Sequence, residues 1–220
     1  MIKLLTIEDA GDITGKKIIL RSDLNVPVSD GKITNSFRID KMIPTLDLLR
    51  QKGAKVLLFS HITKNKDYDS LYPMFDYLNG FLPVKFCKTY FTKEADGMIA
   101  DMKDGDILLF ENIRMNSGED ANDIEFAKKL SSYGDIFINE AFSESHRKQA
   151  SILFLPQFLP HYAGPLFLEE VSNLSKVFQP KHPFVFILGG AKFETKLPLI
   201  KKYLDRADTV FVAGDGSDTV

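Results

Sequence analysis

The chain has 220 residues, which fits one large domain or one domain and part of a second. Its 28 Lys and Arg nearly balance its 30 Asp and Glu, and the formal net charge of −2 argues against a general nucleic-acid or membrane surface. Cys87 is the single cysteine, which excludes an intramolecular disulfide and suits a reducing compartment. The N-terminus has no pattern of a signal peptide, and we expect a cytoplasmic protein without nucleic-acid or membrane partners.

Strand and helix patterns alternate along most of the chain. The sequence predicts strands at 17–22, 54–60, 83–87, 106–110 and 135–139, and helices at 37–52, 70–80, 92–103 and 122–133. The strands are short and continuously apolar, which is typical of parallel strands covered by helices on both faces. The alternation therefore predicts an α/β fold with a doubly wound, Rossmann-like parallel sheet.

The rhythm changes in the last part of the chain. Residues 150–165 contain several prolines, 166–179 have the pattern of an amphipathic helix, and a strand–helix–strand pattern follows at 184–188, 193–205 and 209–213. A single βαβ unit cannot cover both faces of its sheet. We therefore expect a substrate domain at 1–165, an inter-domain helix and hinge at 166–182, and the beginning of an incomplete second α/β domain at 183–220.

Polar side chains follow the predicted strands at their carboxyl ends, where open parallel sheets bind ligands. They are Asp23, Asn25 and Arg38 after the first strand, His61 and Lys64 after the second, Arg114 after the fourth and Arg147 after the fifth. Arginine guanidinium groups can form paired hydrogen bonds with carboxylate or phosphate groups. This edge of the predicted sheet, the polar rim, therefore suits a small, multiply anionic ligand. Each residue also has a simpler interpretation: an Asx turn for Asp23, a solvated position for Arg38, a rim histidine for His61, and pairing of the other arginines with Glu111 or Glu144.

The segment GGAKFETK, residues 189–196, is a glycine-rich turn between the predicted strand 184–188 and helix 193–205. Such a turn lets the backbone approach phosphate groups, and Lys192 and Lys196 share one helix face. The segment is not a Walker A sequence, and lysines on a solvated helix face are the simpler alternative.

Together these segments resemble a known family. RSDLNVPVSDGKITNSFRI, SHI, LLFENIR, INEAFSESHR and ILGGAKFETK occur in the order and at the spacing of the signature segments of phosphoglycerate kinase. The resemblance implies a two-lobed, monomeric enzyme that transfers a phosphoryl group between 1,3-bisphosphoglycerate and ADP, giving 3-phosphoglycerate and ATP, with Mg²⁺ accompanying the nucleotide. A GxGxxG dinucleotide-binding turn after the first strand is absent from the sequence.

The resemblance also assigns residues. The substrate-binding set would be Asp23, Asn25, Arg38, His61, Lys64, Arg114 and Arg147. The nucleotide-binding set would be Gly189, Gly190, Lys192, Lys196 and Gly214. Arg38 and Lys192 would flank the transferring group as catalytic residues, and no metal ion held by the protein alone is expected.

The chain departs from the family pattern at several positions. SHITKN replaces SHLGRP, so Lys64 stands for an arginine. EAFSESHRKQ replaces DAFGTAHRAH, with Glu140 for Asp, Ser143 for Gly and Gln149 for His. AGDGSDTV, with Asp215 and Asp218, replaces GGGMAxTF, and family members continue well past this point. Alternatives are therefore a non-catalytic relative that binds only 3-phosphoglycerate, and a structural scaffold without ligand.

Overall fold

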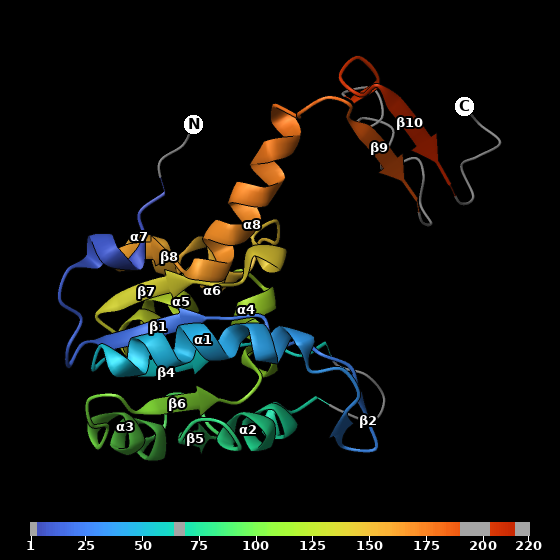
Figure 1. Ribbon diagram of the computed structural model, residues 1–220. Coiled ribbons are helices and arrows are strands. Elements are labelled where there is room, and N and C mark those ends of the chain that lie inside the picture. The colour runs from blue at the N-terminus through green and yellow to red at the C-terminus, as the bar shows by residue number, and fades with distance from the viewer. Residues whose placement is uncertain (1–3, 64–68, 190–202, 214–220) are drawn as a thin grey trace. The chain divides into compact units, whose positions relative to one another are not determined.

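The computed structural model describes residues 4–63, 69–189 and 203–213. The chain divides into two compact units, Met1–Glu170 and Val171–Val220. The sheet of the first unit and the helices beside its strands can be followed in Figure 1.

A six-stranded sheet forms the centre of the first unit, in the order β5-β6-β4-β1-β7-β8, with every neighbouring pair parallel. Its strands are β1 (Lys17–Arg21), β4 (Lys55–Phe59), β5 (Val84–Cys87), β6 (Ile107–Phe110), β7 (Ile136–Asn139) and β8 (His161–Ala163). The parallel α/β sheet expected from the sequence is confirmed. The edge strand β8 was not predicted, because a three-residue segment inside a proline-rich stretch has no periodicity of its own and depends on pairing with β7.

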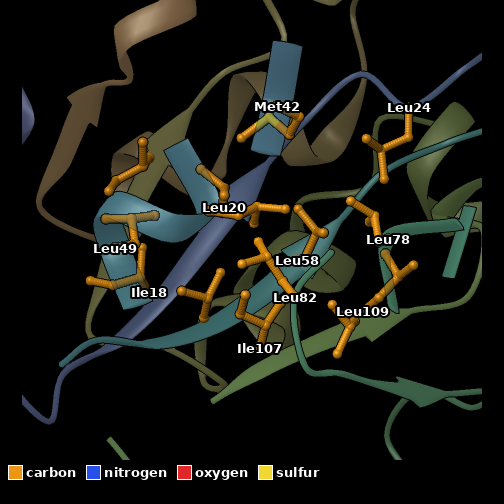
Figure 2. Close-up of a cluster of buried hydrophobic side chains, with 14 of the residues drawn as sticks. Ile18, Leu20, Leu24, Met42, Leu49, Leu58, Leu78, Leu82, Ile107 and Leu109 are labelled. Carbon is orange, nitrogen blue, oxygen red and sulfur yellow. The ribbon is translucent and has the colours of Figure 1, made fainter. Parts of the chain in front are cut away.

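In each central strand, the side chains of successive residues point to opposite faces of the sheet and pack in different cores, as the two-residue period of a strand requires. In β1, Ile18 and Leu20 pack in one cluster, while Ile19 packs in a second cluster on the opposite face. Figure 2 shows side chains of the first cluster contributed by β1, β4, β6, α1 and α2. Both faces of the sheet are thus covered, which explains the continuous apolar runs.

Helices supply the other half of each core. They are α1 (Phe37–Gln51), α2 (Tyr72–Asn79), α3 (Lys93–Ala100), α4 (Ser117–Asp120), α5 (Ile124–Ser131), α6 (Ala150–Leu153), α7 (Leu155–Phe158) and α8 (Pro165–Ser175), with 3₁₀ turns η1 (Ile7–Ala10), η2 (Ile113–Met115), η3 (Phe142–Glu144) and η4 (Lys176–Phe178). The first core takes Met42 and Leu46 from α1, and the second takes Leu130 from α5. The predicted helices are confirmed with shorter ends, and the helix expected at 166–179 stops at Ser175 and continues as η4.

The Asp-Gly turn in the opening loop forms a small hairpin. β2 (Val28–Ser29) pairs antiparallel with β3 (Lys32–Ile33). Asp30 and Gly31 between them have φ values of 50° and 70°. Consecutive positive φ angles favour glycine and aspartate in two-residue hairpin turns.

In the second unit, β9 (Val185–Leu188) pairs parallel with β10 (Thr209–Val212), as the βαβ pattern predicts. Most of the predicted helix 193–205 lies outside the described residues. Within the described ranges, no helix has the length and apolar character needed to cross a membrane.

Candidate anion-binding site

The carboxyl ends of β1 and β4 are fastened together by one hydroxyl group. Ser60 Oγ donates to the carbonyl of Ser22 at 3.0 Å and accepts from the backbone N–H of Leu24 at 2.8 Å. Both serines are fully buried. The loops that leave the two strands therefore start from a fixed geometry, and their polar side chains meet at one edge of the sheet.

Asp23 and Arg38, which are separated by the hairpin, form an ion pair at this edge. Arg38 Nη1 donates to Asp23 Oδ2 at 2.7 Å and to the carbonyl of Asn25 at 3.3 Å. Asp23 Oδ1 also accepts from the backbone N–H of Asn25, which makes an Asx turn, and Ser143 Oγ donates to Asp23 Oδ2. The Arg38 side chain keeps 51% of its surface exposed. It is thus anchored at one nitrogen and open to solvent elsewhere.

Asn25 connects this pair to the loop after β4. Its Nδ2 donates to Thr63 Oγ1 at 3.2 Å, and its Oδ1 accepts from the backbone N–H of Thr63 at the same distance. Arg114 Nη1 approaches Thr63 Oγ1 to 3.5 Å from the loop after β6. The polar residues after β1, β4 and β6 are therefore joined through Thr63.

Arg114 and Arg147 converge on one carboxylate, that of Glu144. Arg114 Nη2 lies 2.7 Å from Glu144 Oε2, and Arg147 Nε lies 2.9 Å from the same oxygen. Glu111, the other acid considered for Arg114, instead accepts from the backbone N–H groups of Leu71 and Asn112. Two arginines that are 33 residues apart in the sequence thus contact the same carboxylate oxygen.

His61 lies under these cations and is fully buried. Burial first, and then the charges of Arg21 and Arg114, lower the pKa of His61 to about 2, so the ring is neutral at physiological pH. Its Nδ1 faces the donor Arg21 Nη2 at 3.4 Å, which places the ring proton on Nε2. Nε2 lies 3.5 Å from Glu144 Oε1.

Among the described residues, His61 Nε2 and Arg114 Nε belong to the few buried polar atoms without a hydrogen-bond partner. A buried donor left without an acceptor costs about 1–3 kcal/mol. An acid lies near each atom without forming a hydrogen bond: Glu144 Oε1 is 3.5 Å from His61 Nε2, and Asp120 Oδ1 is 3.6 Å from Arg114 Nε. An anionic ligand at this point would supply the missing acceptors.

The neutral state of His61 predicts a pH-dependent stability. The folded pKa lies below the ordinary value of 6.5, so only the unfolded chain gains a proton as the pH falls, and stability present above pH 6.5 is lost below it. Between pH 7.5 and 5 the wild type should lose about 2 kcal/mol of unfolding free energy that His61→Gln does not lose. Urea unfolding at several pH values measures this difference.

The matched control for that measurement is His161→Gln, which changes an exposed histidine at the start of β8. It should keep the slope of the wild type. Equal slopes for the wild type and His61→Gln would show that His61 gains a proton in the folded chain, against this interpretation.

Arg21, the last residue of β1, is a buried charge that is not among the site residues predicted from the sequence. It is fully buried, and burial lowers its pKa while Glu119 opposes that shift. Its Nε donates to Ser151 Oγ at 3.0 Å, and its Nη2 lies 3.8 Å from Glu119 Oε1. The signal that could identify it is an arginine at the end of an otherwise apolar strand, next to the polar residues that follow the strand.

A cavity of about 580 Å³ opens beside the paired arginines. Arg114 and Arg147 line it together with Thr63, Asp120 and Gln149. The volume lies in the range of small-molecule sites. Asp23 and Arg38 are not among its lining residues, and they connect to it through the hydrogen bonds of Thr63.

The structure brings together some of the sequence-predicted site residues and leaves others undescribed. Asp23, Asn25, Arg38, His61, Arg114 and Arg147 gather at one edge of the sheet. Gly189 follows β9 in the second unit. The other predicted residues lie outside the described ranges: Lys64, Gly190, Lys192, Lys196 and Gly214.

Glu140, which stands where the family segment has Asp, forms its hydrogen bonds away from the arginines. Its Oε1 accepts from Thr45 Oγ1 at 2.7 Å, and its Oε2 accepts from the backbone N–H of Phe167 in α8 at 2.9 Å. Burial raises the pKa of this carboxyl group. Glu140 therefore joins β7 to α1 and α8.

A parallel α/β domain whose strand ends gather arginines beside a cavity belongs to the class of open-sheet proteins, whose ligands bind at this edge, and its arginines suit an anion. Comparison with known proteins gives the particular family, because the family model described as phosphoglycerate kinase matches residues 7–219. The chain belongs to the phosphoglycerate kinase family.

Individual relatives agree over nearly the whole chain. The phosphoglycerate kinase of Methylorubrum extorquens (strain PA1) is 39% identical over 226 residues, covering 100% of this chain and 56% of its own. That of Orientia tsutsugamushi (strain Ikeda) is 43% identical over 221 residues, covering 97% and 54%. The chain therefore spans about half the length of these relatives.

A solved structure shows the same fold. The phosphoglycerate kinase from Pyrococcus horikoshii OT3 superposes with a TM-score of 0.87 at 31% identity, covering 95% of this chain and 55% of that one. The doubly wound parallel sheet is thus the fold that this chain shares with the matched part of that structure.

Proposed function

We propose that this chain carries the acid-substrate domain, and the beginning of the nucleotide domain, of an enzyme that transfers a phosphoryl group reversibly between 1,3-bisphosphoglycerate and ADP. The products in the forward direction are 3-phosphoglycerate and ATP. The observation that carries the proposal is the convergence of Arg114 and Arg147 beside a cavity, with partnerless buried donors on Arg114 and His61.

Each polar group of the rim suits one part of the acid substrate. The guanidinium groups of Arg114 and Arg147 and the Nε2–H of His61 can donate to a phosphate group, and Lys64 would add charge there. Asp23 and Asn25 suit hydroxyl groups. Arg38, half exposed and anchored on Asp23, can turn its remaining nitrogens toward a transferring phosphoryl group and stabilise the charge on its equatorial oxygens.

This chemistry explains the absence of a catalytic dyad from the proposed set. The acceptor in either direction, a carboxylate or a nucleotide phosphate, is already ionised at pH 7. No general base is therefore required, and positioning with electrostatic stabilisation accounts for most of the catalysis.

The nucleotide would be held by the second unit, through Gly189, Gly190, Lys192, Lys196 and Gly214, with Lys192 opposite Arg38 at the transferring group. Within the described residues no cluster of His, Cys, Asp and Glu could hold a metal ion. The resemblance implies that magnesium would come with the nucleotide phosphates, whose charge it would neutralise. The proposal also includes a substrate domain at 1–165, a hinge at 166–182 and the beginning of the nucleotide domain at 183–220. It further includes a monomeric state and a cytoplasmic location.

Binding of 3-phosphoglycerate tests the acid site directly. The ligand should raise the melting temperature of the chain, because a ligand at 100 times its dissociation constant adds about 2.7 kcal/mol of stability. Arg114→Met and Arg147→Met should each abolish most of this shift. The matched control is Arg50→Met, which removes a guanidinium paired with Asp47 on α1. A full shift in Arg114→Met would contradict the assignment.

A second candidate is a relative that binds the acid without catalysis. Departures from the family pattern favour it: Lys64 and Gln149 in the acid-substrate part, and the acidic Asp215 where a nucleotide phosphate would bind. This candidate predicts stabilisation by 3-phosphoglycerate and none by ADP with Mg²⁺. A longer chain that supplies the remaining length of the relatives should phosphorylate 3-phosphoglycerate in a coupled assay under the first candidate only.

A further inference from the structure

Glu144 differs from the other buried acids of the first unit in what holds its carboxylate. Glu111 and Glu119 each accept from a backbone N–H group and a hydroxyl group, and the cationic neighbour of Glu119, Arg21, lies 3.8 Å away without a direct hydrogen bond. Glu144 has cationic partners: Arg114 at 2.7 Å, Arg147 at 2.9 Å and the ring of His61 at 3.5 Å. The residue is only 5% exposed. Its carboxylate is therefore placed as an anionic ligand would be.

We propose that Glu144 is an internal ligand of the anion site, and that it determines the site's affinity and specificity. Its carboxylate engages the guanidinium groups that the proposed function assigns to the substrate's phosphate, so the inference rests on that function. A phosphate group can take Nη2 of Arg114 and Nε of Arg147 only after Glu144 has turned away from them. The chain thus carries its own competitor for the site.

The geometry of the site supports binding of a phosphate group by displacement of the Glu144 carboxylate from the arginines. Glu144 ends the short turn η3, and the cavity that Arg114 and Arg147 line lies beside its carboxylate. His61 Nε2 and Arg114 Nε form no hydrogen bond, although Glu144 lies 3.5 Å from the first and Asp120 lies 3.6 Å from the second, so these carboxylates do not satisfy the whole set of donors. A phosphate group offers more acceptor oxygens than a carboxylate and could reach these donors as well.

The competing interpretation is a clamp, in which Glu144 holds the arginines in position for the substrate. The two interpretations predict opposite signs. If Glu144 competes, its removal strengthens anion binding. If it positions the arginines, its removal weakens binding.

The experiment measures dissociation constants for inorganic phosphate and for 3-phosphoglycerate by calorimetric titration at constant ionic strength. Glu144→Gln removes the charge and keeps the shape, and Glu144→Thr removes the carboxylate and leaves a hydroxyl group. Both variants should bind phosphate on the order of tenfold more tightly than the wild type, since one nearby like charge has gone. The control, Asp47→Asn, makes the same charge change in an Arg pair on α1 and should leave binding unchanged.

Each outcome decides between the hypotheses. Unchanged or weaker phosphate binding in both variants overturns the inference, whatever the wild type does with 3-phosphoglycerate. Tighter phosphate binding without any preference for 3-phosphoglycerate supports the inference and contradicts the proposed function. No binding of either anion by any variant contradicts both. Thermal unfolding without ligand checks that Glu144→Thr folds, and the near-isosteric Gln variant decides the matter if it does not.

Discussion

Replacing Glu119 by glutamine is expected to lower the free energy of unfolding by about 3–5 kcal/mol, the cost of leaving a buried charge without its partner. Glu119 and Arg21 are both fully buried, with 3.8 Å between Glu119 Oε1 and Arg21 Nη2. Ser151 connects them, because its Oγ accepts from Arg21 Nε at 3.0 Å and donates to Glu119 Oε1 at 2.6 Å. Denaturant unfolding at neutral pH measures the loss.

Two further variants show whether the loss comes from the uncompensated charge. Asp47→Asn, in the partly exposed pair with Arg50, should change stability by no more than about 0.5 kcal/mol. Arg21→Met combined with Glu119→Gln should recover most of the loss, since removal of a whole buried pair is often neutral. A double variant as unstable as Glu119→Gln alone would contradict this explanation.

Gly164→Ala is expected to cost about 3 kcal/mol, because the new methyl group overlaps a fixed side chain. A Cβ at Gly164 would lie 2.1 Å from Cδ of Glu140 and 2.5 Å from its Cγ. Glu140 cannot move without losing its hydrogen bonds to Thr45 and to the N–H of Phe167. Thermal or denaturant unfolding of the variant measures the cost.

Shortening Glu140 tests the cause of that cost. Glu140→Asp, the residue of the family segment, removes one methylene group and should restore part of the stability of the Gly164→Ala variant. Gly97→Ala in α3 is the matched control, since no atom lies within 4 Å of the added Cβ, and it should stabilise by about 0.5–1 kcal/mol. Additive effects of Gly164→Ala and Glu140→Asp would show that the two residues do not interact, against this prediction.

The departure at Glu140 illustrates what the sequence could not show. In the sequence, Glu140 is only a departure from the Asp of the family segment, with no indication of its partners. In the structure the carboxylate extends to α8 and Thr45, and Gly164 leaves room for the longer side chain. The space comes from a residue 24 positions later, and no local pattern connects the two.

Sequence alone determined the parallel α/β architecture and the order of its strands and helices, because apolar runs and helical spacing are local signals that a covered sheet requires. It also placed Arg38, Arg114 and Arg147 at strand ends, since parallel strands finish at one edge. Only the tertiary structure decided which groups meet there: the buried pair of Arg21 and Glu119, the edge strand β8, and Glu144 between two arginines. Those contacts depend on side-chain direction and burial, which arise when distant segments pack and which no periodicity along the chain records.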